Sequence, residues 1–411
     1  MTAPTDHSTE AGSAWPVLAL NSGSSSLKFG LYRVHASRVE LLVGGQAEGI
    51  GAAGSVFHAS DAQARILLRE TAPLASQEAA VARIGKFLAD AKIPAPRAIG
   101  HRIVHGGPKL RQHCRIDDAV WRELEAATAF APLHMPAALA VIRYAQAHFP
   151  GLAQVACFDT TFHATLPDVA RVLPVARELQ AQGVQRYGFH GLSCESIVHQ
   201  LAHELAHGLP ERVLIAHLGN GASVTAVKGG RSIDTSMGLT PSGGLIMGTR
   251  SGDLDPGLLI YLLRQKNYDA ERLQTLVDRQ SGLLGISGLA SDMRRLHAAA
   301  ATDADARLAV QMFCACVAKQ LAAMITVLDG VDLIVFSGGI GENDALVRAA
   351  ICSGLDWFGI RLDAGRNRHA GGVTDRSIGD AASRCAVHVV ASREDEQIAR
   401  HTRSLLHPGH A

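Results

Sequence analysis

The chain lacks most of the short patterns that assign a protein to a functional class directly. Its net charge is only +1, which gives no basic surface for nucleic acid. The P-loop pattern GxxxxGK[ST] and the zinc pattern HExxH are both absent, although there are 20 histidines. No apolar run approaches the roughly 20 residues that span a bilayer. We therefore expect no nucleic-acid partner, no membrane association and no metal hydrolase built from these histidines.

Cysteine pairs are missing as well. The seven cysteines are scattered from Cys114 to Cys385 and form no CxxC pattern. Buried thiols in a reducing, cytoplasmic location are the expected state. Residues 1–14 are small and polar, without the apolar core of a signal peptide. They are expected to form a disordered tail, and a cloning or start-site extension is an equal alternative.

Three short segments rich in glycine and small polar residues are the most informative feature present. They are residues 21–28 (NSGSSSLK), 217–223 (HLGNGAS) and 337–343 (SGGIGEN), and each directly follows an apolar, β-branched run. Glycine lets the backbone turn tightly and brings its N–H groups close to an anion. One such turn is usually a simple hairpin, but three of them at strand ends favour a nucleotide phosphate tail held from several sides.

The length of 411 residues favours two or three domains. Strands are expected at residues 17–21, 27–34, 98–104, 153–158, 213–218, 223–228, 231–235, 331–336 and 386–390. Helices are expected at residues 77–91, 117–129, 137–148 and 306–328. The opening of strand, small-residue turn and returning strand occurs twice, about 200 residues apart, which indicates a duplicated α/β domain.

Several charged residues stand beside glycines or at strand ends. Arg102 and Arg250 suit the binding of a carboxylate or phosphate, although either one alone is more often a surface ion pair. Asp159 could orient a nucleophile or water around Mg²⁺, or cap a helix. His190 could donate to a transferring phosphoryl group. Glu394 could reach a metal, although acidic runs such as residues 394–396 usually form a solvated helix start.

Together these segments closely resemble the acetate kinase family, in the superfamily of acetate and sugar kinases, heat-shock chaperones and actin. The resemblance covers residues 17 to about 402. The stretches that carry it are NSGSSSLKF (21–29), HRIVHGG (101–107), APLHMP (131–136), FDTTFHATLP (158–167), RYGFHGLS (186–193), HLGNGAS (217–223), DTSMGLTP (234–241), MGTRSGDLDP (247–256), SDMR (291–294) and FSGGIGEN (336–343).

The resemblance implies an α/β fold of two duplicated actin-like (ribonuclease H-like) domains facing across a nucleotide cleft. The first domain would comprise residues 15–160 and 396–411. The second, residues 161–395, would carry the nucleotide site and the interface of a homodimer. The implied reaction is ATP + acetate ⇌ ADP + acetyl phosphate, by direct in-line transfer with Mg²⁺, or with Mn²⁺ in its place. A role in making acetyl-CoA would follow from that product.

The resemblance also implies roles for individual residues. Arg102, Arg250, His190 and Asp159 would be catalytic, and Asn21 and Glu394 would serve the metal. The acetate would contact Arg102, Val104, Leu133, His134, Phe189 and Pro241. The nucleotide and its phosphates would contact Lys28, His217, Leu218, Gly219, Asn220, Gly221, Asp292, Met293, Arg294, Gly339, Ile340, Gly341, Glu342 and Asn343.

Alternatives within and outside the family remain. Val104 leaves little room for longer acyl chains, so acetate should be preferred over propionate, but one methylene is worth only about 1–3 kcal/mol. A propionate or butyrate kinase is therefore the runner-up, and a non-catalytic ATP-driven switch is a more distant alternative. Met135 and residues 242–244 depart from the family pattern, which bears on substrate affinity rather than on the reaction.

Overall fold

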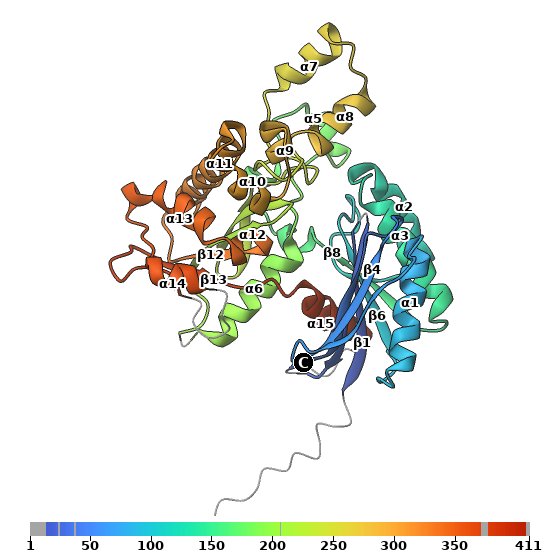
Figure 1. Cartoon of the computed structure of the whole chain (residues 1–411). Helices are drawn as coiled ribbons and strands as arrows, with labels where there is room; N and C mark the ends of the chain where they lie inside the picture. Colours follow the sequence, from blue (N-terminus) through green and yellow to red (C-terminus); the bar gives the residue numbers. More distant parts are fainter. Residues whose placement is uncertain (1–13, 24, 37, 206, 371–376, 408–411) are drawn as a thin grey trace, which may run out of the picture. The chain divides into compact units, whose positions relative to one another are not determined.

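The computed structural model describes residues 14–407 except residues 24, 37, 206 and 371–376. The described residues form two compact units (Figure 1). The first contains the residues up to Thr161 and those from Arg393 onward, and the second runs from Phe162 to Ser392. The chain returns to the first unit at Arg393, three residues before the expected boundary, and helix α15 (Glu394–Leu406) packs on the first unit's sheet. Of the expected tail, residues 1–13 lie outside the described residues.

The first unit is built on an eight-stranded sheet with the strand order β5-β4-β3-β2-β1-β6-β8-β7. Its strands are β1 (Trp15–Ser22), β2 (Ser26–Val34), β3 (Val39–Glu48), β4 (Val56–Asp61), β5 (Ile66–Thr71), β6 (Ala98–Ile103), β7 (Cys114–Arg115) and β8 (Ala153–Phe158). Its helices, besides α15, are α1 (Gln77–Asp90), α2 (Asp118–Ala127) and α3 (Met135–His148).

Helices cover both faces of this sheet, which explains why the central strand is apolar throughout. Four consecutive residues of β1, at positions 17–20, are buried, although alternate side chains of a strand point to opposite faces. Leu18 and Leu20 join the core formed with α1 and α3. Helix α15 contacts β1, β2, β6 and β8. It lies so close to β6 that a side chain at Gly100 would overlap Ile398 and Thr402.

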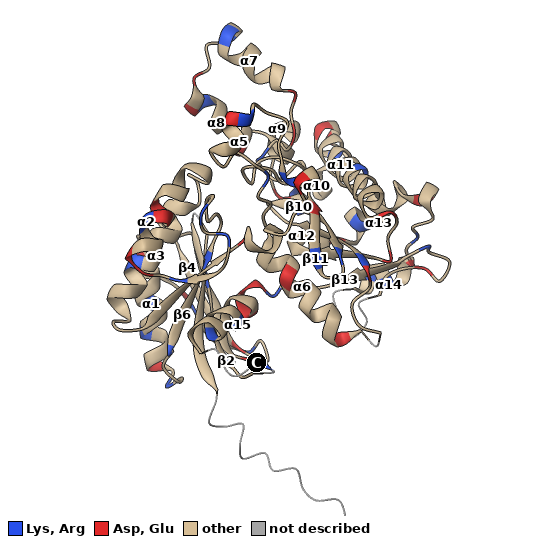
Figure 2. Ribbon diagram, turned by 180° about the vertical axis from the view of Figure 1, so that it is seen from behind, with Lys and Arg blue, Asp and Glu red and all other residues tan. Residues whose placement is uncertain are grey.

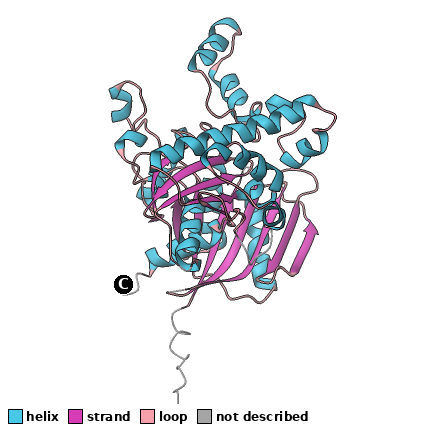
Figure 3. Ribbon diagram, turned by 90° about the vertical axis from the view of Figure 1, so that its left-hand side faces the viewer, coloured by secondary structure: helices cyan, strands magenta, loops and turns pink. Residues whose placement is uncertain are grey.

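The second unit is built on a five-stranded sheet with the order β11-β10-β9-β12-β13. Its strands are β9 (Arg212–Leu218), β10 (Ala222–Lys228), β11 (Arg231–Thr235), β12 (Leu333–Ser337) and β13 (Ala386–Val389). Its helices are α4 (Asp168–Arg171), α5 (Arg177–Ala181), α6 (Gly191–Glu204), α7 (Pro256–Gln265), α8 (Ala270–Arg279), α9 (Gly282–Ser287), α10 (Met293–Ala299), α11 (Ala304–Leu328), α12 (Gly338–Asn343), α13 (Ala345–Ser353) and α14 (Ala364–His369). Figure 3 shows the strands with their covering helices.

The two sheets share one five-strand pattern. In the first unit β3, β2 and β1 are antiparallel neighbours, and β6 and β8 continue the sheet parallel to β1. In the second unit β11, β10 and β9 are antiparallel, and β12 and β13 continue parallel to β9. The pairing is the same strand for strand, which is the fold expected of a duplicated actin-like α/β domain.

Helix α11 is the longest of the described helices and corrects one expectation. Among the described residues it is the helix long and apolar enough to cross a membrane, with a mean hydropathy of 1.7. The expectation that no apolar run approaches the length of a membrane span is therefore wrong for this helix. Its apolar residues have another partner, because ten of them are buried and the helix contacts β9, β10, α9, α10 and α13 within the second unit.

The expected strands and helices are all present, with ends within two residues of the expected positions. The third glycine segment differs, because residues 338–343 form helix α12 rather than an open turn. Strands β3, β4, β5 and β7, and the described helices of the second unit other than α11, had no counterpart among the expected elements.

Candidate functional site

A polar cluster stands at one edge of the first unit's sheet. Strands β1, β6 and β8 are parallel neighbours, so their carboxyl ends meet there. Asn21 lies near the end of β1, Arg102 near the end of β6, and Asp159 directly after β8. Helix α15 begins at the same place with Glu394 and Asp395. Local strand endings therefore bring together residues that are more than 370 positions apart in sequence.

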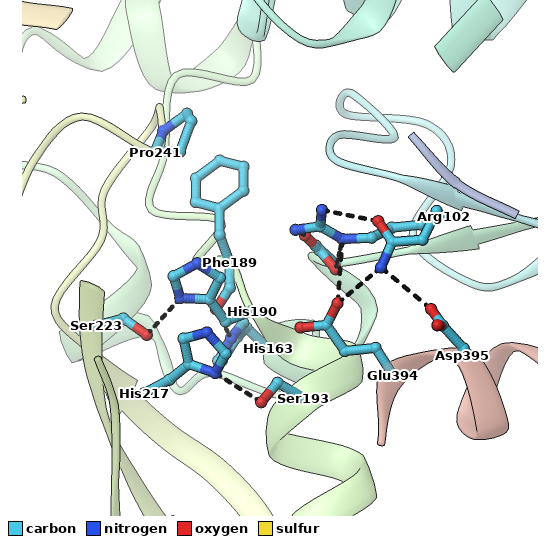
Figure 4. A network of polar contacts seen from close by, with 12 residues as sticks. Arg102, His163, Phe189, His190, Ser193, His217, Ser223, Pro241, Glu394 and Asp395 are labelled. Atoms are coloured by element: carbon cyan, nitrogen blue, oxygen red, sulfur yellow. Dashed lines mark hydrogen bonds and ion pairs between the residues drawn. The ribbon is translucent and has the colours of Figure 1, made fainter. Parts of the chain in front are cut away.

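Arg102 is the centre of this cluster. Its guanidinium donates from Nε to Asp159 Oδ1 at 3.1 Å and from Nη2 to Asp159 Oδ2 at 2.5 Å, a bidentate pair. It also donates from Nη1 to Asn21 Oδ1 at 3.3 Å and lies 3.7 Å from Glu394 Oε2. Asn21 Nδ2 in turn donates to Glu394 at 3.1 Å and to Asp395 at 3.2 Å (Figure 4).

Negative charge exceeds positive charge around Arg102. Burial raises the pKa of Asp159 to about 6, because Arg102 only partly offsets the loss of hydration and Glu394 adds repulsion. Burial also raises the pKa of Asp395, although Lys28 lowers it. For Arg102 itself, burial would lower the pKa, but the carboxylates of Asp159 and Glu394 outweigh that effect and raise it. The cluster therefore favours an additional cation.

The second unit holds a separate group of histidines. His190 adopts a left-handed conformation with φ of 58° directly before helix α6. Its Nδ1 is 2.9 Å from Ser223 Oγ, and its ring stacks on that of His217 with centroids 4.2 Å apart. His217 Nδ1 is 2.7 Å from Ser193 Oγ (Figure 4). The serines at the starts of α6 and β10 thus fix both imidazole rings.

Arg250 reaches the same group from a loop between β11 and α7. Its Nη1 donates to the carbonyl of Pro241 at 2.9 Å. A Cβ placed on Gly221 would lie 3.3 Å from His190 Nε2 and 3.4 Å from Arg250 Nη1. His190 and Arg250 therefore both border the Gly-Asn-Gly turn, and the absent side chain of Gly221 leaves room for them.

A pocket of about 570 Å³ opens beside the same turn, within the second unit. Three segments supply its wall: the turn after β9, the start of α10, and α12 with the residue after it. Its lining residues are Gly219, Asn220, Ser291, Asp292, Met293, Arg294, Gly339, Ile340, Asn343 and Asp344. The volume lies in the range that small-molecule sites occupy.

Known proteins match nearly the whole chain. A sequence model of the acetokinase family matches residues 16–400. The chain belongs to the acetokinase family. An acetate kinase of Nitrobacter hamburgensis is 42% identical over 398 residues, covering 95% of this chain and 96% of its own.

Two solved structures show the same fold throughout. The crystal structure of a propionate kinase from Francisella tularensis has a TM-score of 0.87 at 37% identity, covering 96% of this chain and all of its own. The crystal structure of Porphyromonas gingivalis acetate kinase has a TM-score of 0.82 at 34% identity with the same coverages. Similarity at this level makes the chain an ATP-dependent kinase with a nucleotide site.

In this acetokinase-family chain, the pocket contains eight of the residues expected at the nucleotide, from Gly219 to Asn343, and adds Ser291 and Asp344. His217, Leu218 and Gly221 belong to the neighbouring β9–β10 hairpin, and Gly341 and Glu342 to α12, but none of the five lines the pocket. Lys28 lies in the first unit, on β2, opposite Asn21 of β1. Asp395 joins Asn21 although the sequence offered no signal beyond an acidic helix start.

The residues expected around acetate are divided between the two units. Val104, Leu133 and His134 belong to the first unit, where Val104 is buried and His134 directly precedes α3. Phe189 and Pro241 belong to the second and are both buried. Of the residues that depart from the family pattern, Met135 is buried in α3, and Ser242 donates to Asp278.

Proposed function

We propose that this acetokinase-family enzyme transfers the γ-phosphoryl group of ATP to acetate, reversibly and in line, giving ADP and acetyl phosphate. The observation that carries the proposal is the Arg102 cluster, in which one guanidinium is shared by Asn21, Asp159 and Glu394. Phosphoryl transfer depends on positioning and charge neutralisation more than on covalent chemistry by the protein. A guanidinium that is held by carboxylates, with only 20% of its side chain exposed, is oriented before the substrate arrives.

Arg102 and Arg250 would bind the acetate carboxylate and the transferring phosphoryl group. The planar guanidinium matches both groups with paired hydrogen bonds. His190 would donate a hydrogen bond to the charge that develops on the phosphoryl oxygens, because Ser223 and the stacked ring of His217 fix its orientation. Asp159 would orient substrate or water through its carboxylate.

A divalent cation fits the first unit's cluster. Asn21 and Glu394 would hold it, and Asp395 adds a third oxygen-bearing side chain. Carboxylate and amide oxygens are the ligands that Mg²⁺ prefers, and Mn²⁺ accepts the same set. The cation would neutralise phosphate charge, and the excess of carboxylates over cationic side chains is what suits the cluster to it.

The nucleotide would occupy the 570 Å³ pocket of the second unit. Gly219 and Gly339 would let the backbone approach the phosphates beside Asn220, and His217, Gly221 and Lys28 would add donors nearby. Asp292 caps α10 and binds Arg294 at 2.6 Å, and this hydrogen bond lowers the pKa of Asp292 to about 2. Its carboxylate lines the pocket and would accept hydrogen bonds from the ribose or base.

Acetate would be preferred over longer acids. Val104, Leu133, Phe189 and Pro241 would form the methyl pocket, with His134 near the acyl phosphate. The second candidate is propionate kinase activity, which the likeness to the Francisella enzyme favours.

The free state of all seven cysteines fits a reducing, cytoplasmic location.

A homodimer is the proposed assembly. Helix α7 has no buried residue, and Leu258, Ile260, Tyr261 and Leu263 on it are each 39–49% exposed. It extends from the body of the second unit and carries almost no charge (Figures 1 and 2). An exposed helix of this composition is typical of an interface, and a second copy would bury it.

The test is an acyl-hydroxamate assay with purified enzyme, ATP and Mg²⁺. Acetate, propionate and butyrate are compared in parallel, and hydroxylamine traps any acyl phosphate. We expect strong signal with acetate, weaker signal with propionate and little with butyrate. Equal signal with propionate would favour the second candidate. No signal with any acid, while ADP still binds, would contradict the kinase proposal and favour an ATP-driven switch.

A further inference from the structure

Helix α12, which forms one wall of the nucleotide pocket, is fixed at both ends by side chains that do not line the pocket. At its start, the Glu342 carboxylate turns back and accepts from Gly338 N–H at 3.0 Å. At its end, the buried Arg348 guanidinium donates to the carbonyls of Gly341 and Glu342 at 2.9 and 3.0 Å. The side chain of Glu342 is therefore directed at backbone rather than into the pocket.

The same oxygen of Glu342 has a second backbone partner far along the chain. Oε1 accepts from the N–H of Ser392 at 3.0 Å. The preceding carbonyl, of Ala391, accepts from Gln200 Nε2 on helix α6 at 3.0 Å. Ser392 is the last residue of the second unit before the chain returns to the first. The end of this segment is thus attached to α12 and to α6, the helix that begins next to His190.

The position of Ser392 in the chain connects this attachment to the proposed metal site. Ser392 stands two residues before Glu394, so their Cα atoms are at most about 7 Å apart. Glu394 begins α15 and accepts from Asn21, and both are proposed metal-site residues. One carboxylate therefore joins the wall of the nucleotide pocket to the backbone directly before a metal-site residue.

We propose that Glu342 is a positioning residue that couples the nucleotide pocket to Glu394, and not a ligand of the nucleotide. This inference rests on the proposed function for the roles of the pocket and of Glu394. Through Gly338 it sets the start of α12, and through Ser392 it sets the point from which the chain reaches Glu394. When the carboxylate is lost, Arg348 still holds the carbonyls of Gly341 and Glu342, so α12 should remain as a wall of the pocket while the metal is misplaced relative to the phosphates.

The test compares Glu342→Ala, Glu342→Gln and the control Asp305→Asn, which changes an exposed carboxylate on α11. For Glu342→Ala we expect kcat to fall about tenfold to a hundredfold, as a misplacement of about 1 Å can cause. ADP affinity measured in EDTA should change less than about threefold. Amide hydrogen exchange at Ser392 should rise in the free enzyme. Glu342→Gln keeps an oxygen that accepts both N–H groups, so it should recover most of the kcat.

Two outcomes would overturn the proposal. A loss of metal-free ADP affinity as large as the loss of kcat would make Glu342 a direct nucleotide ligand. Unchanged exchange at Ser392, or a Gln variant as impaired as the Ala variant, would remove the positioning role. Exchange and ADP binding do not depend on the acid substrate, so these outcomes are distinguishable from a failure of acetate kinase activity in the unaltered enzyme.

Discussion

Among single residues, Arg250 is the one whose proposed role separates chemistry from nucleotide binding. It borders Gly221 and His190 and is held by the carbonyl of Pro241, but it does not line the nucleotide pocket. We expect Arg250→Ala to lower kcat by about 10³-fold, the scale that phosphoryl-transfer arginines supply. The dissociation constant of ADP, measured by calorimetry, should change less than about threefold.

Arg250→Lys is the matched variant, because it keeps the charge and loses the planar fork. It should recover only a small part of the kcat if paired hydrogen bonds to the phosphoryl group matter. If both variants weakened ADP binding as much as catalysis, Arg250 would instead belong to the nucleotide site.

At the same scale, sequence reasoning found the residues that stand beside glycines and missed those defined by folding. Arg102 and Asp159 could be chosen because each ends a strand, and the structure joins them directly. Asp395 could not, because an acidic helix start looks solvated until Asn21 is placed against it. Glu342 was expected at the nucleotide because it lies in a glycine-rich segment, but its carboxylate faces backbone amides.

Secondary-structure elements were predicted correctly where an apolar run in the sequence is followed by a glycine or another turn residue. Strands β9 and β12 are apolar runs that end at glycine, and both occur where expected. Strand β3 was missed because Gly44 and Gly45 interrupt its pattern. The structure gives Gly45 a reason, since a side chain there would overlap the backbone of His58 and Ala59 on β4. Residues 338–343 were expected to turn, but Glu342 and Arg348 stabilise them as helix α12.

Helix α7 provides a test at the scale of one element. Its apolar residues are only partly covered by the described part of the chain, so we expect them to pack against a second copy. Ile260→Asp would bury an unpaired carboxylate there, at a cost of about 3 kcal/mol or more, which is at least about a 100-fold weaker dimer. Light scattering after size exclusion should show the shift from dimer to monomer.

Val169→Asp is the matched control, because Val169 is an apolar residue on α4, outside α7, and is 92% exposed. It should leave the mass unchanged. A monomeric unaltered protein, or an Ile260→Asp variant that stays dimeric, would place the assembly surface elsewhere or remove it.

For the molecule as a whole, the repeated five-strand sheet explains how one chain supplies two kinds of site. The carboxyl ends of β1, β6 and β8 present carboxylates and an arginine in the first unit. The equivalent region after β9 and β12 in the second unit presents glycine turns and a pocket. The duplication was visible from sequence as a repeated opening. That Ser291 and Asp344 complete the pocket wall was not, because no local pattern marks them.

Each unit also contains a buried histidine whose pKa is lowered by burial, and these two histidines predict how stability changes with pH. Burial lowers the pKa of His163, in the second unit, to about 4. Its Nε2 lies 2.9 Å from the carbonyl of Phe189, so it carries the proton, and Nδ1 accepts from Ser232. In the unfolded chain the pKa is near 6.5. The stabilisation is therefore complete above pH 6.5 and is lost as the pH falls toward 4, by about 3 kcal/mol in total.

The first unit should respond less, because its ionisable groups act in opposite directions. Burial lowers the pKa of His101 to about 4, so His101, like His163, makes its unit less stable as the pH falls. Burial also raises the pKa of Asp159 to about 6 and raises that of Asp395, so both take up protons more readily when folded. Acidification from pH 6 to 4 thus favours the folded first unit through two carboxyl groups. In the second unit, burial raises the pKa of Asp234, which opposes His163 as Asp159 and Asp395 oppose His101.

We therefore expect the second unit to open before the first when the pH is lowered from 7 to 5. Hydrogen exchange followed by mass spectrometry, corrected for the pH dependence of intrinsic rates, would report each unit separately. His163→Gln removes the titrating group while keeping polar atoms, so it should reduce the pH dependence of the second unit and leave that of the first unchanged. Earlier opening of the first unit, or equal opening of both, would mean that the opposing carboxyl groups do not offset His101 as argued.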